Sequence, residues 1–183
     1  MERRQVGFAA LGLFAFLAGC ASPEVVVNVD AVPAASQHEP NGQAVKVEIT
    51  DIRKATNQER TTIGGVSMGK VILKPPEEEL VRQLVQAKAD EAFARHPKAA
   101  PRIVLCGIRE FQVSTPATLL YWDVNAKIEL VLRVHDRDRI VSGSATERTY
   151  VWPSQEIIRR VTQAALNRVS QETGQALAGL LAE

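Results

Sequence analysis

The sequence has few cysteines and almost no net charge. Its 22 basic and 21 acidic residues give a formal net charge of +1 at pH 7, so nothing in the charge balance indicates a nucleic-acid partner. Two cysteines cannot supply the several disulfide bonds that hold a disulfide-rich fold together. Apolar residues nevertheless make up 45% of the 183 residues, which argues against wholesale disorder and allows one domain with a core of ordinary size.

The apolar run near the start of the chain is too short to span a membrane. It extends from Val6 to Leu17, about a dozen residues, whereas a transmembrane helix needs about 20. Arg3 and Arg4 precede it and small residues follow it, which is the layout of a secretory signal peptide. We therefore predict that residues 1–19 are a signal peptide. The arginine pair leaves the choice between general secretory and twin-arginine export open.

Residues 17–20, Leu-Ala-Gly-Cys, resemble the lipobox of bacterial lipoproteins. The resemblance implies that cleavage leaves Cys20 first in the mature chain. Its thiol would carry two acyl chains such as palmitate, and its freed amine usually receives a third. Chains of this number and length would make membrane attachment effectively permanent. Ala21 and Ser22 follow the cysteine, and the lack of aspartate at the second position favours the periplasmic face of the outer membrane over the inner membrane.

The remaining domain organisation follows from this reading. Residues 20–24 would form a lipidated tether, and residues 25–183 would form a single periplasmic domain. Lipidation of Cys20 would leave Cys106 without an intramolecular disulfide partner in an oxidising compartment. We expect Cys106 to be buried and unreactive.

Apolar periodicity predicts strands over residues 25–30, 45–50, 102–113, 119–135 and 139–151. The clearest alternation lies in 119–135, where Leu130 falls on the core face and Glu129 on the wet face. Residues 103–106 are apolar at every position, which is typical of a central strand. Residues 51–70 are polar and show no period, which predicts a long loop or an irregular hairpin before the short apolar segment 71–73.

Prolines and an N-cap serine indicate where two helices begin. Pro75 and Pro76 open the first, which should end near His96 and Pro97. Carboxylates at 77–79 suit the positive end of its dipole, and this structural role is sufficient. Pro153 and Ser154 begin the second helix. We therefore predict an α+β fold in which two helices pack on one face of a mostly antiparallel, or mixed, sheet of about four to five strands.

Residues 136–138 predict the turn between the last two strands, centred near Arg137. In that register Val141, Gly143 and Ala145 share the core face with Leu130, and their small size leaves room for a helix.

The same register places Trp122 opposite Val151, Trp152 or Pro153, so both tryptophans should gather at the end of the hairpin away from its turn. Tyr121 and Tyr150 should lie close by. One interpretation is structural, with Trp122 buried beneath the final helix; the other is an exposed aromatic edge that binds a partner.

Two glycine-rich patterns resemble chemical motifs. Residues 65–69 match G-x-S-x-G, in which a strand-to-helix turn exposes a serine nucleophile, here Ser67. No core strand precedes the motif and no helix follows it. Gly64-x4-Gly69-Lys70 is close to a phosphate-binding loop, but Val71 stands where serine or threonine should ligate magnesium. A permissive glycine-rich loop explains both patterns.

The histidines do not form a recognisable site. His135, Asp136 and Asp138 adjoin in sequence, but a metal site needs more ligands at defined spacing, so we interpret them as a solvated turn. His38 lies in a polar loop, and His96 lies at a helix end. We expect no metal, no cofactor and no catalytic residue.

Taken together, several features resemble the YajG-like family of uncharacterised bacterial lipoproteins. They are the lipobox, the pattern Val-x-Val-x-Ile-x-Asp-x-Arg over residues 45–53, Ile63-Gly64, and the order of a helix, three strands and a closing helix. The resemblance covers nearly the whole mature domain. It implies an α+β domain with two helices on one face of a mostly antiparallel sheet, and it supplies no catalytic residues.

Two functional hypotheses remain. The first is a membrane-anchored, non-catalytic accessory or binding module of the Gram-negative envelope. Its lipid would hold it on the periplasmic face of the outer membrane, and its partner would be an envelope protein or a cell-wall component. The alternative is an envelope hydrolase or esterase that uses Ser67.

Overall fold

A computed structural model describes residues 24–30, 44–54, 58–99 and 102–182. The predicted signal peptide, Cys20 and His38 therefore lie outside the described residues. Within the described ranges the chain forms seven strands and two helices, in the order β1 (Glu24–Asn28), β2 (Lys46–Asp51), β3 (Glu59–Thr61), β4 (Ser67–Lys74), α1 (Glu77–Arg95), β5 (Ile103–Pro116), β6 (Trp122–Val134), β7 (Arg137–Thr149) and α2 (Gln155–Ala182).

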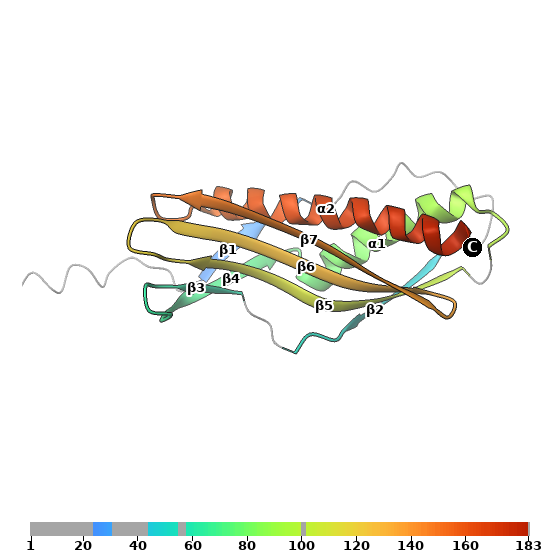
Figure 1. Ribbon diagram of the computed structural model, residues 1–183, viewed down its shortest axis with the longest axis horizontal. Coiled ribbons are helices and arrows are strands. Elements are labelled where there is room, and N and C mark those ends of the chain that lie inside the picture. Colours follow the sequence, from blue (N-terminus) through green and yellow to red (C-terminus); the bar gives the residue numbers. More distant parts are fainter. Residues whose placement is uncertain (1–23, 31–43, 55–57, 100–101, 183) are drawn as a thin grey trace, which may run out of the picture.

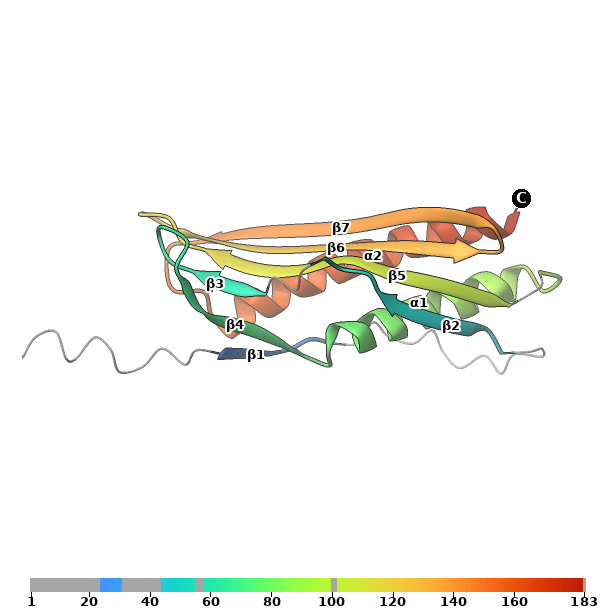
Figure 2. The ribbon, with the colours of Figure 1, turned by 90° about the horizontal axis from the view of Figure 1, so that it is seen from below.

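The strands form one mixed sheet in the order β1-β4-β3-β5-β6-β7, with β2 also paired to β5. The long antiparallel ladder of β5, β6 and β7 extends along the molecule (Figures 1 and 2). β3 and β4 are also antiparallel, whereas β1 with β4, β2 with β5 and β3 with β5 are parallel. The α+β prediction is confirmed, but the expected four to five strands were too few. The polar stretch before residue 71 contributes β3 and the start of β4 without any apolar period.

A bulge at Arg109 reverses the buried side of β5. Cys106 and Ile108 face the core before it, and Phe111 and Val113 face the core after it. The first half of β5 pairs with β2 and its end pairs with β3, so these two strands occupy one edge of β5 in succession. The extra residue in the bulge changes the buried positions of β5 from even-numbered to odd-numbered residues, and the buried side chains before and after it therefore face the same core.

The expectation that residues 103–106 are buried on both faces is corrected. Ile103 and Leu105 are 38% and 37% exposed, because both helices lie on the other face of the sheet. We call the uncovered face the outer face.

α1 begins and ends, and α2 begins, where the sequence predicts. α1 has Pro76 at its N-cap and His96 at its C-cap, with the carboxylates of 77–79 in its first turn. The hydroxyl of Ser154 accepts a hydrogen bond from the backbone N–H of Ile157 (3.3 Å) and caps α2. α2 packs mainly on β6 and β7, and α1 packs against α2 and beside β2 and β5.

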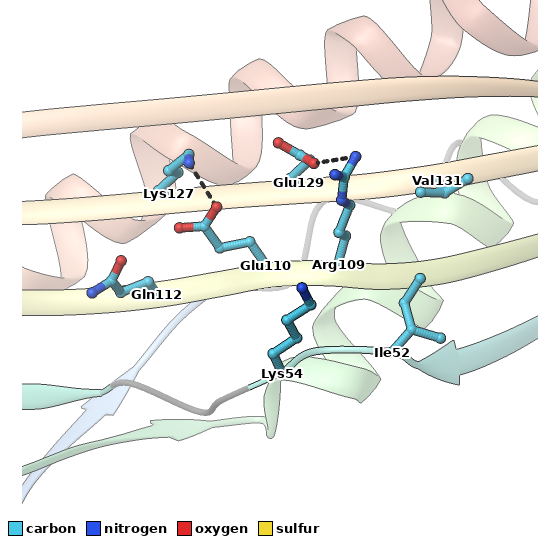
Figure 3. Close-up of a pocket in the computed structure, with 8 residues that line it drawn as sticks. All are labelled: Ile52, Lys54, Arg109, Glu110, Gln112, Lys127, Glu129 and Val131. Carbon is cyan, nitrogen blue, oxygen red and sulfur yellow. Dashed lines mark ion pairs between the residues drawn. The ribbon is translucent and has the colours of Figure 1, made fainter.

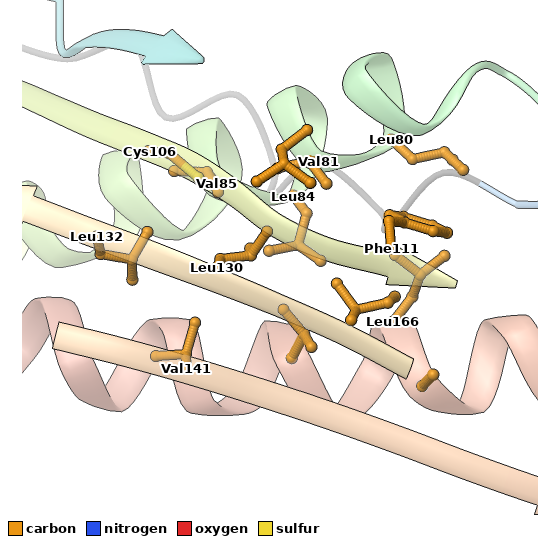
Figure 4. Close-up of a cluster of buried hydrophobic side chains, with 14 of the residues drawn as sticks. Leu80, Val81, Leu84, Val85, Cys106, Phe111, Leu130, Leu132, Val141 and Leu166 are labelled. Carbon is orange, nitrogen blue, oxygen red and sulfur yellow. The ribbon is translucent and has the colours of Figure 1, made fainter. Parts of the chain in front are cut away.

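The core lies between the helices and the sheet. Figure 4 shows Leu84 and Val85 of α1, Leu166 of α2 and Leu130 of β6 meeting in this layer, and all four are buried. Leu130 thus lies on the core face as predicted. Glu129 next to it lies on the outer face, where it forms an ion pair with Arg109 (3.1 Å).

The β6–β7 hairpin keeps the predicted faces but not the predicted turn. Two residues, His135 and Asp136, form the turn between Val134 and Arg137, and His135 has a positive φ of 56°, as the first turn residue of such hairpins requires. Trp122 therefore pairs with Thr149, two residues earlier than the nearest predicted partner, Val151.

The predicted room for a helix over the small residues of β7 is confirmed. Gly143 pairs with Ile128 and Val141 with Leu130, on the core face. A Cβ atom at Gly143 would lie 2.6 Å from the backbone oxygen of Ala165 and 2.8 Å from the backbone nitrogen of Val169. The backbone of α2 therefore rests directly on the backbone of β7.

Candidate functional site

Ser67 lies in a hairpin and not at a strand-to-helix turn. It is exposed at the first position of β4, and its register partner is Thr61 of β3. The described histidines lie at the other end of the molecule, with His96 at the end of α1 and His135 in the β6–β7 turn. The fold thus does not bring a described histidine to Ser67.

The turn around His135 is a solvated one. His135 and Asp136 are exposed, and Asp138 forms an ion pair with Arg133, with Nε to Oδ1 at 2.5 Å. The hydrogen bond from Arg133 lowers the pKa of the Asp138 carboxyl. No group of three or more metal-binding side chains occurs among the residues that the structure describes.

Cys106 is buried in the core, as predicted, at 2% exposure. Burial raises the pKa of its thiol to about 12, which removes the thiolate form that reacts with oxidants and electrophiles.

The two tryptophans and two tyrosines do gather at the end of the hairpin away from its turn. The rings of Trp122 and Trp152 meet edge to face with centroids 4.7 Å apart, and those of Tyr121 and Tyr150 do so at 6.4 Å. Trp122 is half-buried, whereas Trp152 is 44% exposed. The cluster is therefore structural on the Trp122 side and open to a partner on the other side.

Arg60 lies beneath this cluster, and no sequence pattern identified it as a buried residue or as part of a site. It is the central residue of β3, only 2% exposed, with its guanidinium carbon 4.5 Å from the Trp152 ring centroid. Its Nε and Nη2 atoms have no hydrogen-bond partner in the described part of the chain. Burial lowers the pKa of the guanidinium, so Arg60 is a desolvated cation that helps position Trp152.

Three connections surround the aromatic cluster and carry exposed apolar side chains. They are the β3–β4 turn, the β5–β6 connection and the β7–α2 connection, which lie together at one end of the molecule (Figure 1). The backbone N–H of Ala117 donates to the oxygen of Thr61 (3.1 Å), and the ring contacts join the second connection to the third. We call the following six exposed residues the apolar tip: Ile63, Val66, Leu119, Leu120, Tyr150 and Val151.

A second candidate surface is a groove of about 680 Å³ on the outer face (Figure 3). Its charged side chains form two ion pairs, Lys127 with Glu110 (2.6 Å) and Arg109 with Glu129 (3.1 Å). The hydrogen bond from Lys127 to Glu110 raises the pKa of the lysine. Arg109 reaches the groove because it occupies the bulge of β5.

One end of the groove is apolar. Ile52 lies over Gly107, where a Cβ atom would come within 2.9 Å of the isoleucine Cδ1 and 3.9 Å of the Val131 Cβ. Val131 pairs with Ile140 of β7, and Leu105 lies two residues before Gly107 on β5. We call Ile52, Leu105, Val131 and Ile140 the outer patch; three of them are more than a third exposed.

No family model and no curated protein matches the chain. Among solved structures, an uncharacterised protein covers 86% of this chain and 98% of its own length at 9% identity, with a TM-score of 0.38. A DUF330 protein from Xanthomonas campestris covers 87% and 95% at 11% identity, with a TM-score of 0.37. A candidate lipoprotein from Caulobacter crescentus covers 52% and 82% at 14% identity, with a TM-score of 0.28. Such TM-scores define neither a family nor a function for this chain.

None of the helices in the described ranges is both long enough and apolar enough to cross a membrane.

Proposed function

We propose that this chain is a lipid-anchored, non-catalytic binding module of the Gram-negative cell envelope. Acyl chains on Cys20 hold it on the periplasmic face of the outer membrane. The lipobox supports the anchor, and Ala21 and Ser22 support the outer membrane. The YajG-like resemblance supports the class. The partner is a segment of an envelope protein that lies in the groove of the outer face.

The groove carries the binding part of this proposal. Its two ion pairs satisfy four of the five charged side chains that line it, all but Lys54. Ile52 and Val131 of the outer patch therefore supply the apolar area of the groove from which affinity derives. A patch of aliphatic side chains with a rim of paired charges has the composition of a protein interface. The charged rim sets the orientation of the partner more than its affinity.

The anchor is tested with Cys20→Ser. The variant should lose metabolic labelling with palmitate and should leave the membrane fraction, because no other residue supplies the thiol at the cleavage site. Density fractionation of the wild-type protein then identifies the membrane. Labelling and membrane recovery equal to wild type would refute the lipid anchor, and recovery with inner membranes would refute the outer-membrane assignment.

The groove is tested by placing a photocrosslinking residue at Gln112, which lines it, and at Gln163, on α2. Envelopes should give one discrete adduct from position 112 and none from 163. Ile52→Glu should remove that adduct, because it places a charge in the outer patch, and Ile52 is exposed enough for the change to leave folding intact. The same adduct from both positions, or one that survives Ile52→Glu, would refute the groove as the binding surface.

The non-catalytic part is tested with an esterase screen of the wild type and Ser67→Ala. Robust activity that is lost in the variant would establish the alternative hydrolase.

A further inference from the structure

The exposed apolar side chains of the described residues are concentrated at one end. Eleven large apolar residues are exposed, and seven of them are Trp152 and the six residues of the apolar tip. Leu119 and Leu120 are the most exposed, at 85% and 78%. A water-exposed Leu side chain forgoes the free energy of burial, so a cluster of exposed apolar side chains indicates a surface that is covered when the protein functions.

The two leucines are held outward by the local backbone. The hydroxyl of Thr118 accepts hydrogen bonds from the backbone N–H groups of Leu120 (3.3 Å) and Tyr121 (3.0 Å). The N–H of Thr118 donates to the oxygen of Tyr121 (2.8 Å) and closes the turn. The leucines are thus presented on a preorganised turn, and covering them would cost little further ordering.

The position of the chain's entry into the domain selects the surface that covers the tip. Glu24 pairs with Lys70, which lies three residues along β4 from Ser67, the residue at which the β3–β4 turn ends. Glu24 therefore lies about 10 Å from that turn, measured along the strands. Three residues lie between Cys20 and Glu24, and the four steps from Cys20 to Glu24 span at most about 14 Å. A lipid on Cys20 therefore keeps the tip end near the bilayer and the β6–β7 end away from it.

The chemistry of the tip fits a lipid interface. Residues 62–69, 117–122 and 149–154 contain no aspartate or glutamate, and the adjoining Asp123 is ion-paired with Arg148 (2.9 Å), so these connections bring no carboxylate of their own to the anionic headgroups. Tyrosine and tryptophan are enriched at membrane interfaces because one end of each ring system is apolar and the other is polar. The opposite end differs sharply, since four of the five residues in the sequence Asp136-Arg137-Asp138-Arg139-Ile140 are charged.

We propose that the apolar tip inserts into the interfacial layer of the membrane that carries the anchor. This inference rests on the anchoring part of the proposed function, and it adds an orientation. The β5–β7 ladder then stands away from the bilayer, and β6, with 13 residues, raises the β6–β7 turn by about 40 Å. The groove on the outer face stays accessible to a partner from the side.

Site-specific fluorescence tests the orientation in the full mature chain. An environment-sensitive NBD probe is attached to a cysteine introduced by Leu120→Cys, Asp136→Cys or Lys54→Cys. Cys106 stays unlabelled, because its burial raises the pKa of the thiol to about 12 and so removes the reactive thiolate. The acylated protein is placed in vesicles of phosphatidylethanolamine and phosphatidylglycerol. The probe at 120 should brighten and shift to shorter wavelength, and the probes at 136 and 54 should not change.

The other outcomes overturn the proposal. A response at 136 would mean that the far end faces the membrane. A response at 54 would mean that the outer face lies flat on the bilayer and that the groove is covered. No response at any position would mean that the tip stays in water.

Unacylated Cys20→Ser chains separate failure of the tip from failure of the anchor. At high lipid concentration they should bind the same vesicles weakly through the tip alone. Leu119→Ser with Leu120→Ser should lower their partition coefficient about tenfold or more, because two aliphatic anchors are lost. Ile140→Ser, which removes an exposed aliphatic residue from the outer patch, should leave it unchanged. If Ile140→Ser lowers partitioning as much as the leucine pair does, the tip is not the membrane contact, whether or not Cys20 is acylated.

Discussion

Gly143→Ala tests the closest contact in the fold, where α2 rests on β7. The added Cβ would meet the Ala165 oxygen at 2.6 Å, the Val169 nitrogen at 2.8 Å and the Val169 Cγ2 at 2.7 Å. Two of these atoms belong to the helix backbone and cannot rotate away. The helix must therefore shift by roughly 1 Å to restore ordinary contact distances, which loosens the packing of Val141 and Ala145 beneath it.

The expected loss combines two opposing effects. Overpacking of a core costs about 1–3 kcal/mol. Replacing glycine in a strand recovers about 0.5–1 kcal/mol of backbone entropy. We therefore expect the free energy of unfolding to fall by about 1–2 kcal/mol in the Gly143→Ala variant. Urea titration of the unacylated mature chain, followed by circular dichroism, measures this change at an unaltered m-value.

Gly174→Ala is the matched control because Gly174 lies inside α2 without the contact. Its Cβ would meet only the Lys88 Cδ, at 3.5 Å, which is ordinary van der Waals distance. This variant should gain about 0.5–1 kcal/mol from helix propensity. Equal stability of the two alanine variants would show that α2 does not rest on β7 at Gly143 and would refute the packing described above.

Two further predictions concern buried polar groups. Arg60→Met should be at least as stable as the wild type, because the cost of desolvating the buried guanidinium should exceed what its contact with the Trp152 ring contributes; a clear loss of stability in urea would show that this contact outweighs the desolvation. The Cys106 thiol should resist alkylation at about pH 8 until urea unfolds the chain, and rapid labelling of the folded chain would contradict its burial. Because folding raises the pKa of this thiol from 9.0 to about 12, its contribution to stability is complete below pH 9.0 and is lost as the pH rises towards 12.

The helices and the hairpin faces were predictable because their signals are local. Pro76 stands at the N-cap position of α1 and Ser154 caps α2, and the sequence pattern starts both helices at these residues. The alternation in β6 identified Leu130 as core and Glu129 as wet, and both assignments hold. The predicted faces of the hairpin are correct although the predicted turn is wrong. The observed partner of Trp122 is two residues from the predicted one, and a shift of two residues leaves every side chain on the same face. The turn was predicted near Arg137 because residues 136–138 are all charged. The residue with a positive φ, which marks the turn, is His135.

The irregular-hairpin alternative for residues 51–70 is confirmed by the antiparallel β3–β4 pair with its register shift. The pattern did not identify β3 as a strand of the sheet, because its parallel pairing with β5 is not local and its inward residue is polar. β3 has only three residues, and the buried one is Arg60, flanked by a threonine and an exposed glutamate. An apolar period of two cannot detect a strand whose inward side chain is charged. The bulge at Arg109 left a trace, since the buried positions change from even numbers to odd numbers between Ile108 and Phe111. That change identifies the bulge only once the core face is known.

The near-zero net charge conceals a strong division of the chain into two ends. Acidic residues are missing from the three connections that form the tip, and charged residues crowd the β6–β7 turn at the far end. The net charge of +1 therefore does not show that the three tip connections carry no charged side chain whereas the far turn carries charges of both signs. Electrostatic attraction to an anionic leaflet needs a cluster of basic residues, and the tip connections contain none. Contact between the tip and a bilayer would then depend on apolar area. The proposed lipid on Cys20 would hold the domain within a few residues of the surface, so a weak apolar contact would suffice to fix its orientation.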